Sequence, residues 1–152
     1  MPTRFMKLGF DDRVIREDGF YNMTLNGKTV GFNLDLRINY YRGLPLSSVH
    51  QIKLTVDGEE IPQDLMLFEL NGKFFTVDQL PELYAEYWGI KKAAHLRVYN
   101  GGLEDGIHDV DVHIEYKSPY MSFGPGIYGM IDGSGKKKMA IGKAREIDET
   151  KY

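Results

Sequence analysis

The stretch that decides the fold runs from residue 20 to residue 48 and reads FYNMTLNGKTVGFNLDLRINYYRGLPLSS. Asn26-Gly27 is a strong hairpin signal, because both central positions of a two-residue turn need a positive φ and these residues tolerate it. After the turn the residues alternate in polarity, as in a strand with one buried face. The apolar members of this alternation are Val30, Phe32, Leu34, Leu36 and Ile38.

The loop length also predicts the register of this hairpin, since a two-residue turn places the apolar residues of both strands on one face. The expected pairs, counted outward from the turn, are Leu25 with Lys28, Met23 with Val30 and Tyr21 with Phe32. A second hairpin is predicted at Asn71-Gly72, where Phe68 should pair with Phe75. Asp57-Gly58 is a further turn signal, and residues 108–116 form the last strongly alternating strand.

One segment has the periodicity of a helix instead. Its apolar side chains recur at i, i+3, i+4, i+7 and i+8, namely Leu80, Leu83, Tyr84, Tyr87 and Trp88. Asp78 is placed to cap its first turn and Gly89 to end it. The many short strands and this one inserted α-helix predict a mainly β protein. We expect an antiparallel β-sandwich, immunoglobulin-like or jelly-roll-like, with an open barrel as the alternative.

Length and composition favour one globular domain. The 152 residues are 42% hydrophobic and 27% charged, as in ordinary soluble proteins. We expect a single domain over 1–141, with a long irregular loop at 118–138 where glycine and proline recur, and a polar tail over 142–152.

The chain has no cysteine, which excludes a disulfide framework and fits a reducing compartment. It has no apolar run as long as a signal peptide or a membrane span, so we expect a cytoplasmic protein without a membrane partner. A net charge of −3 argues against nucleic acid as a partner.

Catalytic and metal-binding patterns are incomplete. Asp109, Asp111 and His113 share one face of a strand and have metal-ligand chemistry, but we favour a solvated sheet face. Ser47 and Ser48 precede His50, yet neighbours in sequence do not make a nucleophile and base, and no G-x-S-x-G elbow is present. The sequence therefore assigns no catalytic residue and no metal or other cofactor to this chain.

Two short groups that follow strongly patterned strands have the chemistry of a docking surface. The groups are Tyr40, Tyr41 and Arg42, and Pro119, Tyr120 and Met121. Tyrosine and arginine are enriched at interface hot spots. We interpret the six residues as a partner interface or the rim of an active site, and a structural corner is the alternative for the first group.

Several of these segments resemble the small (β) subunit of bacterial C-glycoside deglycosidases. The resemblance is carried by GFNLDLRINYYRGLPLS at 31–47, the turn at 56–58, FTVDQLPELYAEY at 75–87 and SPYM at 118–121. It runs in colinear order from the first hairpin to residue 121.

The resemblance implies a heteromeric, lyase-type enzyme. In such complexes a large TIM-barrel-like subunit holds a divalent metal, manganese or magnesium, together with the acid and base residues. The substrate is a 3-oxo-C-glucoside of a flavonoid-type aglycone. The oxo group acidifies the proton on C2, a base removes that proton, and the C–C bond at C1 breaks by elimination.

Under this resemblance the present chain is a non-catalytic accessory subunit that is inactive alone. One alternative is a stand-alone carbohydrate-binding β-sandwich module. A second is a metal-dependent jelly-roll enzyme that would use the face of Asp109, Asp111 and His113. Sugar binding or metal retention by the isolated chain would favour these alternatives.

Overall fold

A computed structural model describes residues 3–7, 15–38, 43–89, 92–122, 128–132 and 135–147. For residues 3–7, 16–18, 118–122 and 128–132 the description is confined to the backbone. Within the described part the chain forms strands and three short 3₁₀ helices. In chain order these are β1 (Thr3–Lys7), β2 (Ile15–Leu25), β3 (Lys28–Leu36), β4 (Leu44–Pro45), η1 (Leu46–Ser48), β5 (Val49–Val56), β6 (Glu59–Glu60), η2 (Gln63–Leu65), β7 (Met66–Leu70), β8 (Lys73–Thr76), η3 (Val77–Glu82), β9 (Tyr87–Trp88), β10 (Ala94–Val98), β11 (Ile107–Ser122), β12 (Tyr128–Asp132), β13 (Gly135–Ala140) and β14 (Gly142–Glu146).

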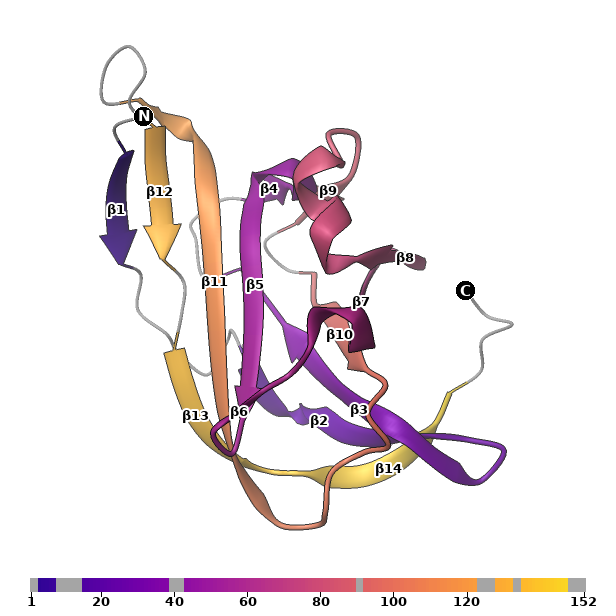
Figure 1. The fold of residues 1–152 in the computed structure, drawn as a ribbon. Helices are drawn as coiled ribbons and strands as arrows, with labels where there is room; N and C mark the ends of the chain where they lie inside the picture. The colour runs from indigo at the N-terminus through magenta and orange to yellow at the C-terminus, as the bar shows by residue number, and fades with distance from the viewer. Residues whose placement is uncertain are drawn as a thin grey trace.

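Two large sheets face each other, which confirms the mainly β sandwich (Figure 1). The first sheet has the order β1-β12-β11-β5-β6, with β13 also paired to β11. The second has the order β14-β2-β3-β10-β7-β8, and β4 pairs with β9 in a separate two-stranded sheet. Most pairs are antiparallel, but β1–β12 and β14–β2 are parallel.

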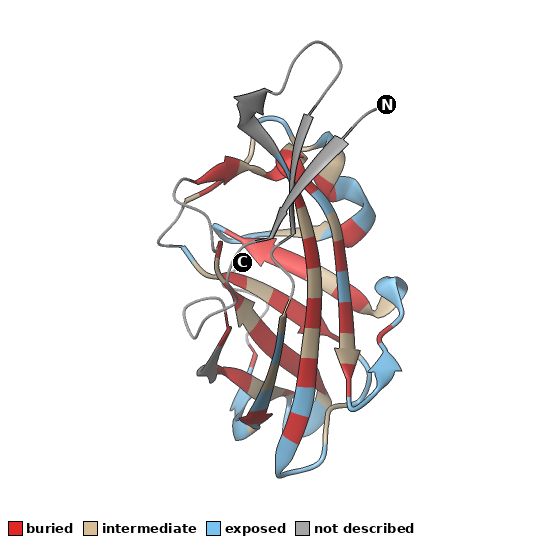
Figure 2. Ribbon diagram, turned by 90° about the vertical axis from the view of Figure 1, so that its left-hand side faces the viewer, coloured by how far each residue is buried: buried red, intermediate tan, exposed pale blue. Residues whose placement is uncertain are grey.

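The core lies between the two large sheets. Along the long strands, buried positions alternate with less buried ones, as the banding in Figure 2 shows. Of the residues of β3 that the alternation predicted to face inward, Phe32, Leu34 and Leu36 are fully buried, whereas Val30 is half-buried. The three buried residues pack with the inward residues of β5, β10 and β11 in one hydrophobic cluster. The alternation therefore predicted the inward face of this strand correctly.

The first hairpin forms at Asn26-Gly27, where φ is 52° and 80°. Leu25 pairs with Lys28 as predicted, but Met23 pairs with Gly31 and not with Val30. Val30 is the extra residue of a β-bulge, and its carbonyl accepts a hydrogen bond from the Gly101 N–H at 3.1 Å. The predicted register is therefore wrong by one residue beyond the bulge. The Val30 carbonyl has no partner in β2, and the loop that contains Gly101 supplies one instead.

The other two turns are as predicted. Asn71 and Gly72 have φ of 55° and 79°, and Phe68 pairs with Phe75. Asp57-Gly58 joins β5 to β6, with φ of 51° at the aspartate. These turns are decided by local backbone chemistry, so short-range signals were sufficient to place them.

The predicted α-helix is wrong. Its segment forms the 3₁₀ helix η3, followed by an irregular piece and the short strand β9. Thr76 caps η3 in a capping box with Gln79, and Gly89 has no positive φ. Leu80 and Trp88 are buried, whereas Tyr84 is 79% exposed. No helix of the described chain is long and apolar enough to cross a membrane.

The segment expected to be a long irregular loop, 118–138, is largely strand where it is described. β11 continues to Ser122, and β12 and β13 follow. The expected polar tail also contains a strand, because β14 pairs with β2 in the second sheet. Lysine and glycine residues interrupt the alternation of apolar residues in β13 and β14, so the sequence pattern did not indicate strands there. These segments are strands because they form hydrogen bonds with strands far away in the sequence.

Candidate functional site

The two predicted docking groups lie largely beyond what the structure describes. Residues 40–42 are outside the described residues, and residues 119–121 are described only as backbone within β11. Gly43 continues the first group into β4, and Tyr116, just before the second, pairs with Val49 at the start of β5. The segments next to both groups therefore lie at the same end of the sandwich, the upper end in Figure 1. We call it the β4–β9 end.

Local packing closes the core at the β4–β9 end. Leu44 pairs with Trp88, and the indole packs edge-on against Phe68 with ring centroids 5.3 Å apart. The Trp88 Nε1–H donates to the Lys92 carbonyl at 2.9 Å, so the buried indole nitrogen is satisfied. Gly43 lies so close to this strand that an added Cβ would be 2.7 Å from the Trp88 carbonyl oxygen.

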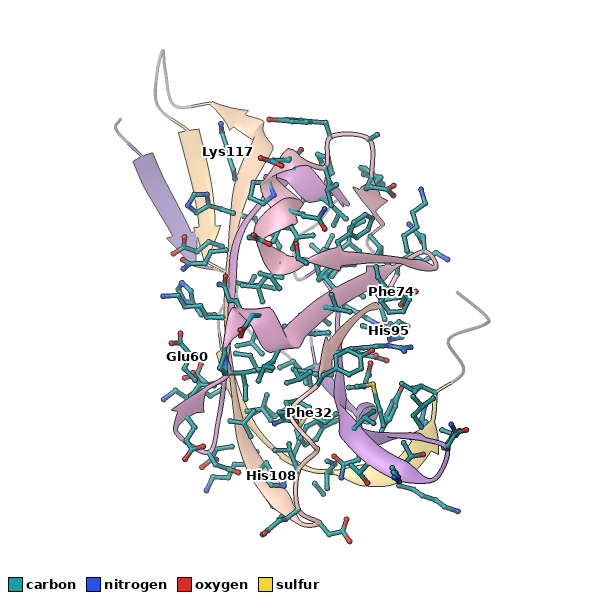
Figure 3. The ribbon with its side chains drawn as sticks, turned by 45° about the vertical axis from the view of Figure 1, so that its right-hand side comes forward. Phe32, Glu60, Phe74, His95, His108 and Lys117 are labelled. Carbon is teal, nitrogen blue, oxygen red and sulfur yellow. The ribbon has the colours of Figure 1, made fainter. Side chains whose placement is uncertain are left out.

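A row of ionisable side chains crosses the outward face of the second sheet. His95 of β10 lies between Asp35 of β3 and Glu69 of β7, its partners in the strand register. Its Nδ1 forms a short hydrogen bond with Asp35, and its Nε2 is 3.4 Å from a Glu69 carboxylate oxygen. Figure 3 shows His95 on the same side of the molecule as Phe74. The guanidinium carbon of Arg97 lies 5.4 Å from the centre of the Phe74 ring.

The groups around His95 raise the pKa of its imidazole. The hydrogen bond to Asp35 raises its pKa, burial opposes this, and Glu69 adds to the increase. Glu69 itself is 4% exposed and accepts a hydrogen bond from the Gly72 N–H at 2.9 Å. The imidazole lies between two carboxylates and links three strands, and its raised pKa favours the charged form, so this row is a cross-strand network of ionisable groups.

His108 forms a second network near the end of the molecule that lies opposite the β4–β9 end (Figure 3). Its Nδ1 is 2.6 Å from an Asp57 carboxylate oxygen, and its Nε2 is 2.6 Å from the Glu104 carbonyl oxygen. Both partners are acceptors, so the geometry requires both ring nitrogens to donate, which only the imidazolium can do. Burial lowers the pKa of His108, but these hydrogen bonds outweigh burial and raise it.

The strand face considered for a metal does not assemble a ligand set. The Asp109 carboxylate is 3.9 Å from the Lys138 Nζ, and the Asp111 carboxylate is 3.8 Å from the Lys136 Nζ. These four residues line a surface hollow of about 490 Å³. His113 is 3.0 Å from Glu115 on its own strand. In the part of the chain that the structure describes, no group of three or more His, Asp or Glu residues is placed to hold a metal ion.

The serine and histidine considered as a nucleophile and base differ in their exposure to solvent. Ser48 is buried at the end of η1, whereas His50 is exposed at the start of β5. One cluster of ionisable residues that the structure brings together, His95 with Asp35 and Glu69, carried no local signal in the sequence. They come from three strands and meet only through sheet pairing.

Comparison with known proteins identifies a family that matches most of this chain. The sequence profile of the family described as "C-glycoside deglycosidase beta subunit" matches residues 10–120. A C-glycoside deglycosidase beta subunit of Eubacterium cellulosolvens is 34% identical over 113 residues, which cover 73% of this chain and 77% of the relative. One from Microbacterium trichothecenolyticum is 33% identical over 91 residues, covering 58% of this chain and 67% of the relative.

A more distant relative carries a related name. The 3'-dehydrocarminate deglycosidase beta subunit of a Microbacterium species is 24% identical over 112 residues, which cover 74% of this chain and 81% of the relative. The family match spans well over half of the chain and includes both hairpins, the η3–β9 segment and most of β11. The chain therefore belongs to the C-glycoside deglycosidase beta subunit family.

Proposed function

We propose that this chain is the accessory, non-catalytic subunit of a heteromeric C-glycoside deglycosidase. The observation that carries the proposal is the family match over residues 10–120. Its relatives are named as beta subunits, and this naming implies a complex with a different subunit. In this proposal the other subunit is large and TIM-barrel-like, and it supplies the divalent metal and the acid and base residues.

The surroundings of two histidines in the described part of the chain are consistent with an accessory role. His95 is held between Asp35 and Glu69, and His108 is held by two acceptors. A catalytic base needs a nitrogen directed at the substrate proton, whereas these nitrogens are directed at groups of the same chain. Their role in the fold is to connect strands and turns.

The proposed reaction is elimination from a 3-oxo-C-glucoside of a flavonoid-type aglycone. One relative is named for a 3'-dehydro substrate, which supports an oxidised glycoside as the substrate class. An oxo group next to C2 makes the C2 proton acidic, so that proton removal and cleavage at C1 need no oxidant in this step. The electron pair of the C2–H bond forms the new C1–C2 double bond, the pair of the broken C1–C bond leaves with the aglycone, and an acid returns a proton to that aglycone carbon. The complex would then be a lyase.

Reconstitution tests the proposal. The chain is co-expressed with a candidate large, TIM-barrel-like subunit from the same genome, and the product is examined by size-exclusion chromatography and by turnover of a 3-oxo-C-glucoside with manganese or magnesium. We expect one heteromeric peak that is active, and an inactive chain when it is purified alone. Turnover by the separate chain under the same conditions, or two peaks that never join, would contradict the proposal.

A further inference from the structure

Two tyrosines at the β4–β9 end are exposed although the helical periodicity predicts them to be buried. Tyr84 is 79% exposed and Tyr87 is 53% exposed. Tyrosine is enriched in protein interfaces, because its rigid ring covers a large area at a low cost in conformational entropy. Two large exposed aromatic groups three positions apart in the chain therefore need an explanation that the isolated fold does not provide.

The backbone that presents the two rings is held firmly. The Ser47 N–H donates to the Leu83 carbonyl at 3.2 Å, and the Leu46 N–H donates to the Glu86 carbonyl at 2.8 Å. Lys73 forms an ion pair with the Glu86 side chain at 2.8 Å. Buried side chains anchor both ends of the segment, Leu80 before the tyrosines and Trp88 after them. A surface that is already ordered loses little entropy when a partner binds.

Within the segment that carries the tyrosines, the charged side chains all have one sign. Residues 77–88 contain three acidic residues and no lysine or arginine. Glu86 is paired with Lys73, whereas Asp78 and Glu82 are exposed. A partner that covers the tyrosines is favoured when it presents lysine or arginine, and guanidinium groups also stack well on tyrosine rings.

Tyr87 also lies against Gly43, the first described residue after the group at 40–42. A Cβ added to Gly43 would lie 2.7 Å from the Tyr87 hydroxyl oxygen, so the phenol lies directly against this glycine. β4, which begins one residue later, pairs with the strand that carries Tyr87. An interface that includes Gly43 and β4 would therefore be continuous with Tyr87.

We propose that Tyr84 and Tyr87, with the acidic Asp78 and Glu82 at their rim, form the surface that docks the other subunit of the deglycosidase. The occupant is the large subunit, and it meets this surface with positively charged side chains. The inference rests on the proposed function, because it requires that the complex exists. It adds a binding surface to that function and assigns these residues no part in the chemistry.

Binding of the separated large subunit to variants of this chain tests the inference. Tyr84→Ala should weaken binding by about thirtyfold or more, the loss typical of an interface hot spot. Its melting temperature should stay that of the wild type, because the ring is mostly exposed. Ile107→Ala is the matched control, since Ile107 is 72% exposed at the start of β11, far from the β4–β9 end (Figure 1). It should change binding by less than about twofold.

Charge and proximity give two further measurements. Glu82→Lys should slow association and reduce its dependence on salt, because it removes the attraction to a basic surface. A photo-crosslinking phenylalanine analogue at position 84 should form a covalent product with the large subunit, and the same group at position 107 should not.

The outcomes separate the two proposals. A wild-type chain that forms no complex overturns the proposed function and this inference with it. A wild-type complex that Tyr84→Ala and Glu82→Lys leave unchanged, with no crosslink from position 84, overturns only the docking surface. Dimers of the isolated chain that Tyr84→Ala dissociates would also overturn it, because the occupant would then be a second copy.

Discussion

At the scale of single residues, His108 shows how two acceptors fix a protonation state. The Asp57 carboxylate and the Glu104 carbonyl both require a donor, so the ring is held as the imidazolium. The same carboxylate accepts a hydrogen bond from the Asp109 N–H at 2.9 Å. One aspartate thus joins the β5–β6 turn to the start of β11, and the hydrogen bond from His108 is the main cause of its lowered pKa.

This network predicts a pH dependence of stability. Because the pKa of His108 is raised above its ordinary value of 6.5, its contribution is complete below that value and is lost as pH rises through the folded-state pKa. Asp57 has a lowered pKa, so its contribution is present above its ordinary value of 3.8 and is lost as pH falls through the folded-state pKa. His95, with its raised pKa, adds to the loss on the alkaline side.

Urea unfolding from pH 5 to 9 measures this dependence. The free energy of unfolding should decrease on the alkaline side in the wild type, and the decrease should be smaller in His108→Gln. His50 is exposed, so His50→Gln is the control and should follow the wild type. An unchanged pH profile in His108→Gln would show that the imidazolium contributes nothing to stability.

Tyr116 provides a second residue-scale prediction. Its ring is fully buried, burial raises the pKa of the phenol, and its hydroxyl has no hydrogen-bond partner among the described residues. Tyr116→Phe removes the unsatisfied group and keeps the ring, so it should raise the free energy of unfolding by about 1 kcal/mol. Denaturant titration measures this change. A loss of stability would show that the hydroxyl has a partner outside the described residues.

At the scale of elements, the bulge in β3 depends on one glycine. Gly31 follows the extra residue, and the end of β10 passes directly over it. A Cβ at this position would lie 1.9 Å from the Val98 carbonyl oxygen. That oxygen belongs to the backbone of a central strand and cannot rotate away. The close approach of two strands therefore requires glycine here.

Gly31→Ala should consequently destabilise the protein by about 3 kcal/mol or more, at or above the upper end of the usual cost of overpacking. Gly89→Ala is the matched control, because the nearest atom to its added Cβ is 3.6 Å away and its φ is not positive. The two variants are compared by thermal and chemical unfolding. Equal stability of both would mean that β10 does not approach β3 as described.

At the scale of the whole molecule, the last strands connect the two sheets. β13 pairs with β11 in the first sheet, and β14 pairs with β2 in the second, so the chain crosses from one sheet to the other (Figure 1). Glu146 accepts hydrogen bonds from Thr24 Oγ at 2.6 Å and from the Asn26 and Gly27 N–H groups, the first of which is the main cause of its lowered pKa. The carboxylate thereby caps the first hairpin turn.

A chain that ends at Ile141 should therefore melt at a lower temperature than the full chain. Its β2 edge would lose a hydrogen-bonded neighbour, and hydrogen exchange at residues 21–25 should become faster. Lys143→Ala, in the same strand but with an exposed side chain, is the control and should change neither quantity. Equal melting temperatures for the truncated and full chains would show that β14 does not support the sheet.

The sequence by itself determined the features that depend on near neighbours. The turns at Asn26-Gly27, Asp57-Gly58 and Asn71-Gly72 follow from residues that tolerate a positive φ. The inward residues of β3 follow from a period of two, and the mainly β class follows from many such strands. The family resemblance was also visible in these segments, and the family match confirms it.

Only the tertiary structure decided the features whose hydrogen bonds come from distant parts of the chain. Gly101 binds the Val30 carbonyl and fixes the bulge, and β2 supplies the partner that makes a strand of residues 142–146. The apolar spacing at 80–88 is helical, but bonds from η1 to Leu83 and Glu86 hold that segment in a form that exposes Tyr84. Likewise, Asp35, His95 and Glu69 meet through sheet register alone, because pairing of three separate strands is what sets their distances.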